Sequence, residues 1–123
     1  MIKRFDKKMD IFETTEMAGI VLNNRVLRAA TDECMADQDG NPTQKIVKLY
    51  EKLCSGGIGG IITGFMAVSD DGVSTMPGMI MIDSDKRIPG LAEVVSRVHE
   101  MKTPIICQIA HCGRTELAVK HLM

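Results

Sequence analysis

Amide, imidazole, thiol and guanidinium groups follow one another in the segment Gln108–Arg114, which reads Q-I-A-H-C-G-R. Gln108 is the polar residue of a short apolar run, and its carboxamide can both donate and accept hydrogen bonds. The histidine and the arginine come directly after this run, where they could line a site or form a structural hydrogen-bond cluster. His111 with Cys107 and Cys112 makes a poor zinc site, because no second pair of ligands has the usual spacing. We therefore expect no metal here.

A second group of residues that could do chemistry runs from Ala29 to Cys34. Ala29, Ala30 and Thr31 are small enough to let the backbone approach a flat ligand closely, although ordinary packing with a capping threonine is the alternative. Asp32 is expected to cap the loop that follows, since its short carboxylate can bond nearby backbone groups. Cys34 is expected to be a plain buried thiol.

The elements that must position these residues alternate between strand and helix patterns. The expected order is a hairpin that turns at Asn23-Asn24 and leads into a strand over 25–30, a helix over 43–56, a strand over 59–65, a loop over 66–87, a helix over 89–101 and a strand over 105–110. Short apolar strands that alternate with amphipathic helices indicate an α/β fold with a parallel sheet. Periodicity alone leaves open whether this sheet belongs to a barrel or is doubly wound.

Composition argues against several classes of function. A formal net charge of −1 gives no electrostatic case for nucleic acid or a membrane surface, and aromatic residues, at 3%, are too few for base-stacking platforms. No apolar run approaches the roughly 20 residues that span a membrane, and the basic N-terminus is not followed by the apolar segment of a signal peptide. None of the cysteines forms a C-x-x-C pair, so reduced thiols and a cytoplasmic location are expected.

Four segments, in this order, resemble the old yellow enzyme family of flavin oxidoreductases. They are N-N-R-V-L-R-A-A-T (Asn23–Thr31), G-G-I-G-G-I-I-T-G-F-M-A-V-S (Gly56–Ser69), D-S-D-K-R-I-P-G-L (Asp83–Leu91) and Q-I-A-H-C-G-R (Gln108–Arg114). The resemblance is closest to the branch that groups bacterial ene-reductases with dienoyl-CoA reductase. It implies a (β/α)₈ TIM barrel, of which residues 1–123 would form an incomplete N-terminal portion: a leading hairpin and about three βα units, with no second domain.

The resemblance also implies a cofactor and its contacts. FMN would lie at the C-terminal ends of the barrel strands and would carry hydride from NADH or NADPH to an activated alkene or an enoyl thioester. The amide of Gln108 would bind the pyrimidine edge of the flavin. Backbone groups of Ala29, Ala30 and Thr31 would touch the isoalloxazine and the ribityl chain. Gly64 aligns with a small residue beside the flavin, with close backbone packing as the alternative.

Asp32 departs from the family pattern, which usually has a neutral or weak donor near flavin O4. A carboxylate there would be repelled by the anionic reduced flavin unless it were protonated or turned away. By resemblance, Cys34 falls where some relatives carry a tyrosine near the substrate, and His111 and Arg114 belong to an active-site loop. The alkene-anchoring pair, the proton donor and the FMN-phosphate loops are expected beyond residue 123, so no catalytic residue is assigned.

Two hypotheses remain. The chain is the FMN-binding N-terminal portion of an NAD(P)H-dependent flavin oxidoreductase, inactive in isolation, or it is a truncated, catalytically silent domain that self-associates without flavin. An unpaired sheet edge favours association, and Ile61, Ile62, Ile105 and Ile109 are expected to face solvent or a partner in part. A small doubly wound binding module is disfavoured, because Arg28–Cys34 lacks the glycine of a phosphate-binding turn.

Overall fold

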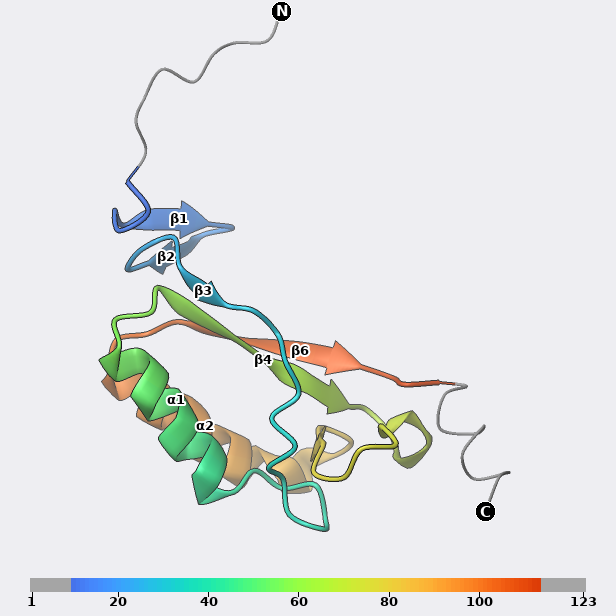
Figure 1. Ribbon diagram of the computed structural model, residues 1–123. Coiled ribbons are helices and arrows are strands. Elements are labelled where there is room, and N and C mark those ends of the chain that lie inside the picture. Colours follow the sequence, from blue (N-terminus) through green and yellow to red (C-terminus); the bar gives the residue numbers. More distant parts are fainter. Residues whose placement is uncertain (1–9, 114–123) are drawn as a thin grey trace, which may run out of the picture.

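A parallel sheet with two helices on one side forms the body of the protein (Figure 1). This computed structural model describes residues 10–113. The central strand β4 (Gly60–Ala67) pairs in parallel with β6 (Ile105–Ala110) along most of its length. The two ends of β4 also pair in parallel with β3 (Leu27–Arg28) and β5 (Ile80–Met81). Strands joined through helices into a parallel sheet are the arrangement that the sequence predicts.

The helices α1 (Gln44–Ser55) and α2 (Ile88–Glu100) lie side by side below the sheet in Figure 1. Apolar residues recur on one side of each helix and are buried there, as a helix of 3.6 residues per turn requires. Pro89 occupies the first turn of α2, where a missing N–H leaves no hydrogen bond unmade. Gly57 ends α1 with a φ of 77° and donates its N–H to the carbonyl of Cys54.

The main core lies between these helices and the sheet. Its buried members are Ile46, Val47, Tyr50 and Cys54 of α1, Ile61 and Met66 of β4, Ile80 of β5, and Val94 and Val98 of α2. Ile61 has no exposed surface, so the expectation that it faces solvent or a partner is wrong. The reason is that both helices cover its face of the sheet. Ile109 is 63% exposed, as expected, and Ile62 and Ile105 are half-buried.

The two faces of the sheet differ in how well they are covered. Successive strand residues point to opposite faces, and paired residues of parallel strands share a face. Ile61 and its partner Ile105 face the helices. The partners Ile62 and Ile106, and then Phe65 and Gln108, therefore face the opposite side. We call this second side the open face; Ile62, Phe65 and Ile106 are half-buried on it.

The leading hairpin differs from its prediction. β1 (Thr15–Met17) pairs with β2 (Ile20–Leu22), and the turn lies at Ala18-Gly19, where both residues have positive φ. The predicted turn residue Asn24 is instead a buried connector, which donates to Gly57 O at 2.7 Å and accepts from Val26 N at 2.9 Å. The sequence signal was ambiguous, because Asn suits both a turn and a backbone-mimicking side-chain bond.

The segment predicted as a loop over 66–87 contains short elements. β4 extends to Ala67, and β5 is flanked by the 3₁₀ turns Asp70–Gly72 and Asp85–Arg87. These turns fold the segment back over the C-terminal end of the sheet (Figure 1). Within residues 10–113, neither helix is long and apolar enough to cross a membrane.

Candidate functional site

The residues predicted to contact a flavin come from three neighbouring strands. Ala29 to Thr31 follow β3, Gly64 lies in β4, and Gln108 lies in β6. Because β3 and β6 both pair in parallel with β4, their C-terminal ends point the same way. The carboxyl ends of parallel strands are where α/β enzymes keep their ligands. The structure therefore brings the five predicted contacts to one region of the sheet.

The segment after β3 crosses β4 directly above Gly64. A Cβ added to Gly64 would overlap Glu33 Oε2 and would lie 2.7 Å from Thr31 O and 2.9 Å from Asp32 Cα. Real Cβ atoms do not approach other atoms so closely, so any other residue here would displace the segment. Close packing within the chain is thus a sufficient reason for this glycine, and contact between Gly64 and a flavin stays a prediction.

A buried ion pair, which the sequence analysis missed, fixes this crossing. The Glu33 side chain is only 2% exposed, and its Oε1 lies 2.8 Å from Arg28 Nη2. The same oxygen accepts hydrogen bonds from Tyr50 Oη at 2.6 Å and from Gly64 N at 3.0 Å. Arg28 also donates to the carbonyl oxygens of Thr31 and Ile62. The arrangement ties the strand-end segment to both β4 and α1.

The signal for this pair was visible in the sequence. Arg28 and Glu33 are two of the four charged residues in the stretch 25–34, which is predicted as a buried strand and its exit. A charge at such a position is almost never buried without a partner. The guanidinium also lies 5.6 Å from the centre of the Tyr50 ring. Burial, the Glu33 carboxylate and its hydrogen bond raise the pKa of the Tyr50 hydroxyl, so it remains a neutral donor.

Gln108 lies on the open face with its side chain exposed. Its backbone N–H donates to Thr63 Oγ1 at 3.1 Å. The residue is exposed, and no hydrogen bond joins its side-chain amide to another of residues 10–113. This placement agrees with the predicted binding role.

Asp32 caps the loop, as one reading of the sequence expects. Its Oδ1 accepts from Cys34 N at 3.1 Å, which closes a short turn. Its Oδ2 is buried and has no hydrogen-bond partner in the part of the chain that the structure describes. Cys34 is exposed and has a φ of 51°, so the expectation of a buried thiol is wrong. Desolvation and the Asp32 carboxylate raise the pKa of this thiol, which keeps it protonated at neutral pH.

His111 packs against the loop after β4. Its Nε2 lies 3.6 Å from Asp71 Oδ1, and its Nδ1 accepts from Gly113 N at 3.0 Å. A Cβ on Gly72 would lie 2.9 Å from the imidazole, so the ring and this loop are in close contact. These bonds favour the structural reading of the histidine. The other candidate in this loop, Arg114, lies outside the described residues.

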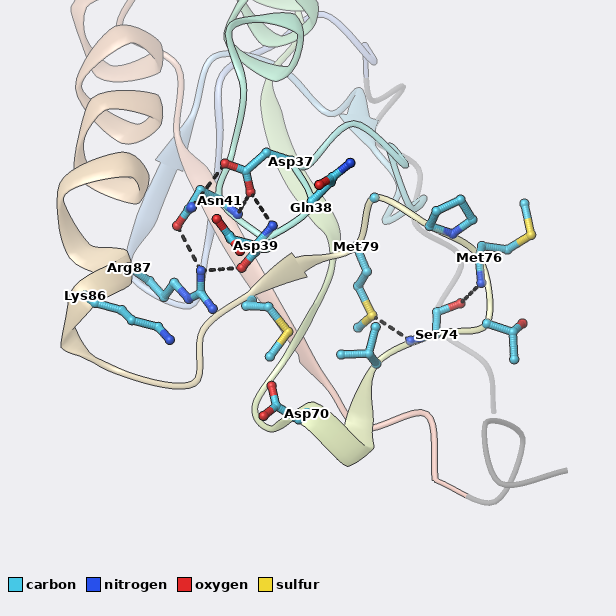
Figure 2. A pocket seen from close by; sticks show the side chains of 16 residues that line it. Asp37, Gln38, Asp39, Asn41, Asp70, Ser74, Met76, Met79, Lys86 and Arg87 are labelled. Carbon is cyan, nitrogen blue, oxygen red and sulfur yellow. Dashed lines mark hydrogen bonds between the residues drawn. The ribbon is translucent and has the colours of Figure 1, made fainter. Parts of the chain in front are cut away.

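A second polar cluster, shown in Figure 2, borders a cleft of about 940 Å³. The carboxylate of Asp37 accepts from Asn41 N at 2.7 Å and from Asp39 N at 3.0 Å, and these bonds lower its pKa. The buried Arg87 donates to Asp39 O, to Asn41 Oδ1 and, at 2.6 Å, to Asp83 Oδ1. The D-S-D-K-R segment therefore has a structural role, because its arginine holds the loop between β3 and α1.

The cleft is separate from the predicted flavin contacts. Neither Gln108 nor any residue from Ala29 to Thr31 lines it. Among residues 10–113, no three histidine, cysteine, aspartate or glutamate side chains gather into a group that could hold a metal ion.

Comparison with known proteins gives a consistent result. Residues 10–120 match the model of the NADH:flavin oxidoreductase / NADH oxidase family. The chain is 36% identical over 96 residues to an NADH:fumarate oxidoreductase from Klebsiella pneumoniae, covering 78% of this chain and 10% of that protein. It is 32% identical over 105 residues to an NADPH dehydrogenase from Halalkalibacterium halodurans, covering 85% of this chain and 31% of that protein. The chain thus spans a tenth to about a third of the length of these relatives.

The fold matches as well. The old yellow enzyme from Trypanosoma cruzi superimposes with a TM-score of 0.77 at 27% identity, covering 85% of this chain and 28% of that one. The alignment therefore confirms the predicted fold class, an N-terminal portion of a (β/α)₈ barrel.

Proposed function

The chain belongs to the NADH:flavin oxidoreductase / NADH oxidase family, and from this premise we propose that it forms part of the FMN site of an oxidoreductase that uses NADH or NADPH. The acceptor in this proposal is a small molecule with an activated alkene, such as an unsaturated carboxylate or an enoyl thioester. The observation that carries the proposal is the exposed carboxamide of Gln108, which lies on the open face of the sheet within the residues that match the family.

The residues present fit a flat heteroaromatic ring. Ile62, Phe65 and Ile106 give the open face a half-buried apolar surface, and Gln108 adds one group that can donate and accept at a ring edge. When bound, FMN would supply the hydride chemistry between the nicotinamide and the alkene.

Each element of the chain has a separate task in this proposal. Gln108 orients the pyrimidine edge of the ring. Ala29 and Thr31 are exposed and Ala30 is half-buried, so their backbone groups can approach the ring without a large side chain between. The anchoring of the Asp32 carboxylate to Cys34 N limits its motion toward the ring.

The names of the relatives support the choice of acceptor. The Klebsiella pneumoniae relative is an NADH:fumarate oxidoreductase, and fumarate is an alkene made electron-poor by two carboxylates. The Halalkalibacterium halodurans relative is an NADPH dehydrogenase, so both nicotinamide cofactors belong in the assay.

The experiment is a flavin spectrum of the purified full-length protein, followed by oxidation of NADH and of NADPH in the presence of fumarate, an enone or an enoyl thioester. We expect flavin absorbance bands and acceptor-dependent oxidation. A colourless protein that also fails to bind added FMN would overturn the proposal. A flavin-loaded protein that reduces none of these alkenes would overturn the acceptor class alone.

A second candidate function is self-association without flavin. Within residues 10–113, β6 pairs only with β4, and its Ile109 is 63% exposed. An uncovered strand edge beside an exposed apolar residue favours pairing with another chain. Light scattering on the flavin-free protein tests this candidate function. A monodisperse monomer would exclude self-association.

We propose a cytoplasmic location as well. Cys34, Cys54, Cys107 and Cys112 are all free, and reduced thiols are typical of that compartment. Fractionation of the source cells, with detection by an antibody, tests the location.

A further inference from the structure

Two sets of hydrogen bonds, joined through the backbone of Gly64, connect the segment after β3 to Gln108. Arg28 binds the Glu33 carboxylate, which accepts the N–H of Gly64 at 3.0 Å. The carbonyl of Gly64 accepts the hydroxyl of Thr63 at 2.8 Å, and the same hydroxyl oxygen accepts the N–H of Gln108 at 3.1 Å. Two strands and the segment that crosses them are thus linked through polar groups.

This series passes through an irregularity in the sheet. Ile62 pairs with Ile106 and Phe65 pairs with Gln108, so β4 advances three residues while β6 advances two. The extra residue of a bulge leaves part of the ladder unpaired. At this irregularity the Thr63 hydroxyl oxygen accepts the N–H of Gln108 at 3.1 Å, which adds a side-chain bond between β4 and β6. The side chain of Thr63 therefore decides how β6 is held at this point.

The linking groups are shielded from water. Thr63 is 2% exposed, and the Glu33 side chain is also 2% exposed. In such surroundings an unmade hydrogen bond is costly, and neighbouring hydrogen bonds polarise one another. Water cannot replace a hydrogen bond that is lost here, so the neighbouring groups must move to find other partners.

We propose that Thr63 and Glu33 are positioning residues, which together fix the position of Gln108 in β6 relative to the Ala29–Cys34 segment. The proposal rests on the proposed function, because these two elements are the ones that would meet the flavin from different strands. Neither Thr63 nor Glu33 needs to touch the ring. Their effect passes through the backbone of Gly64 and of Gln108.

The test uses the full-length protein without added FMN and measures deuterium exchange at the Gln108 amide by mass spectrometry. Thr63→Val removes the hydroxyl at nearly the same volume, and Thr63→Ser restores it. Glu33→Gln keeps the shape but weakens acceptance from Gly64 N. The matched controls are Thr103→Val, at a buried threonine whose side-chain hydroxyl donates to Met101 O, and Glu51→Gln, at an exposed pair with Arg97.

We expect Thr63→Val to speed exchange at Gln108 by about threefold to tenfold, the loss of one hydrogen bond, and Thr63→Ser to bring it back. The decisive variant is Glu33→Gln. We expect it to speed deuterium exchange at the Gln108 amide as well, although no hydrogen bond joins Glu33 to Gln108. The exposed Cys34 should be alkylated faster in Thr63→Val and in Glu33→Gln than in the unsubstituted protein, because the Ala29–Cys34 segment is then held less firmly against β4. The two controls should leave both sites as in the unsubstituted protein.

Exchange at Gln108 that is unchanged by Glu33→Gln would overturn the proposal, since the two ends would then be independent. If Glu33→Gln does not fold, Tyr50→Phe removes one bond to the same carboxylate, retains the ion pair and decides the question in the same way. A parallel FMN titration separates the two proposals. A protein that never binds FMN fails the proposed function while the exchange data still decide the coupling.

Discussion

The carboxylate of Glu33 lies 3.0 Å from the backbone nitrogen of Gly64, a residue 31 positions later in the chain. The glycine has no room for a Cβ because the same glutamate and Thr31 O occupy that space. The hydrogen bond and the missing side chain therefore belong to one contact. It sets how closely the segment after β3 approaches the central strand.

Removal of the carboxylate should be costly. Glu33→Ala leaves Arg28, which is half-buried with 13% side-chain exposure, without its counter-charge. We expect the free energy of unfolding to fall by about 3–5 kcal/mol, as for other buried pairs that lose one partner. Urea unfolding followed by circular dichroism measures it. Glu51→Ala, at the exposed pair with Arg97, should cost about 0–1 kcal/mol, and equal losses in the two variants would contradict the expectation.

Gly64→Ala should also destabilise the protein, because the new methyl group would overlap Thr31 O and Glu33 Oε2. Overpacking of this kind costs about 1–3 kcal/mol. Gly56→Ala is the matched control, since Gly56 has a φ of −76° and its added Cβ would meet its nearest atom at 3.3 Å. Thermal unfolding of both variants measures the difference. A Gly64 variant as stable as the Gly56 variant would show that the segment moves without cost.

Sequence reasoning recovered the elements whose signals are local. Pro89 marks the start of α2, Gly57 marks the end of α1, and the apolar periodicity within each helix locates the core. It failed where the deciding contact is distant in the chain. Asn24 could have made a turn, but it bonds to Gly57 O instead, and no local pattern distinguishes the two uses.

The candidate site shows the same limit. The position of Gln108 at a strand end follows from the pattern of the run in which it lies. Its link to Glu33 does not, because that link depends on a bulge that only the pairing of β4 with β6 reveals. Arg87 is similar. Its role as a clamp on the loop Asp37–Asn41 requires the fold to bring the two segments together.

The Arg87 clamp should make stability depend on acid pH. The hydrogen bond from Arg87 is the main cause that holds the pKa of Asp83 below its usual range. A carboxyl whose pKa is lowered by folding contributes stability that is fully present above its unfolded pKa of about 3.9 and is lost as the pH falls through the lower folded value. We expect Asp83→Asn to flatten the loss of stability below about pH 4. Thermal unfolding at a series of pH values checks this, and an unchanged profile would assign the acid sensitivity to other carboxyls.

Gln108→Leu in the full-length protein should weaken FMN binding. Leucine keeps nearly the same shape but leaves polar groups of the ring edge without a partner, which costs on the order of 1–3 kcal/mol, or roughly tenfold or more in affinity. Quenching of flavin fluorescence during titration gives the dissociation constant. Gln44→Leu is the control, because Gln44 is exposed on α1 and bonds Glu93 on the helix side. An unchanged affinity in the Gln108 variant would assign that residue to structure.

A polypeptide limited to residues 1–123 should show no alkene reductase activity and should self-associate. No alkene-anchoring pair or proton donor is assigned within these residues, so turnover is not expected. Association is expected because Ile62 and Ile106 are only half-buried on the open face, and because Ile109, at 63% exposure, lies on a strand that pairs on one side within the described residues. Ile109→Asp should reduce the associated fraction, whereas Ile88→Asp, at a similarly exposed helix start, should not. Size-exclusion chromatography with light scattering, run beside an NADPH-oxidation assay, measures both properties. A stable monomer of 13.5 kDa would contradict the expected association, and measurable turnover would contradict the expected inactivity.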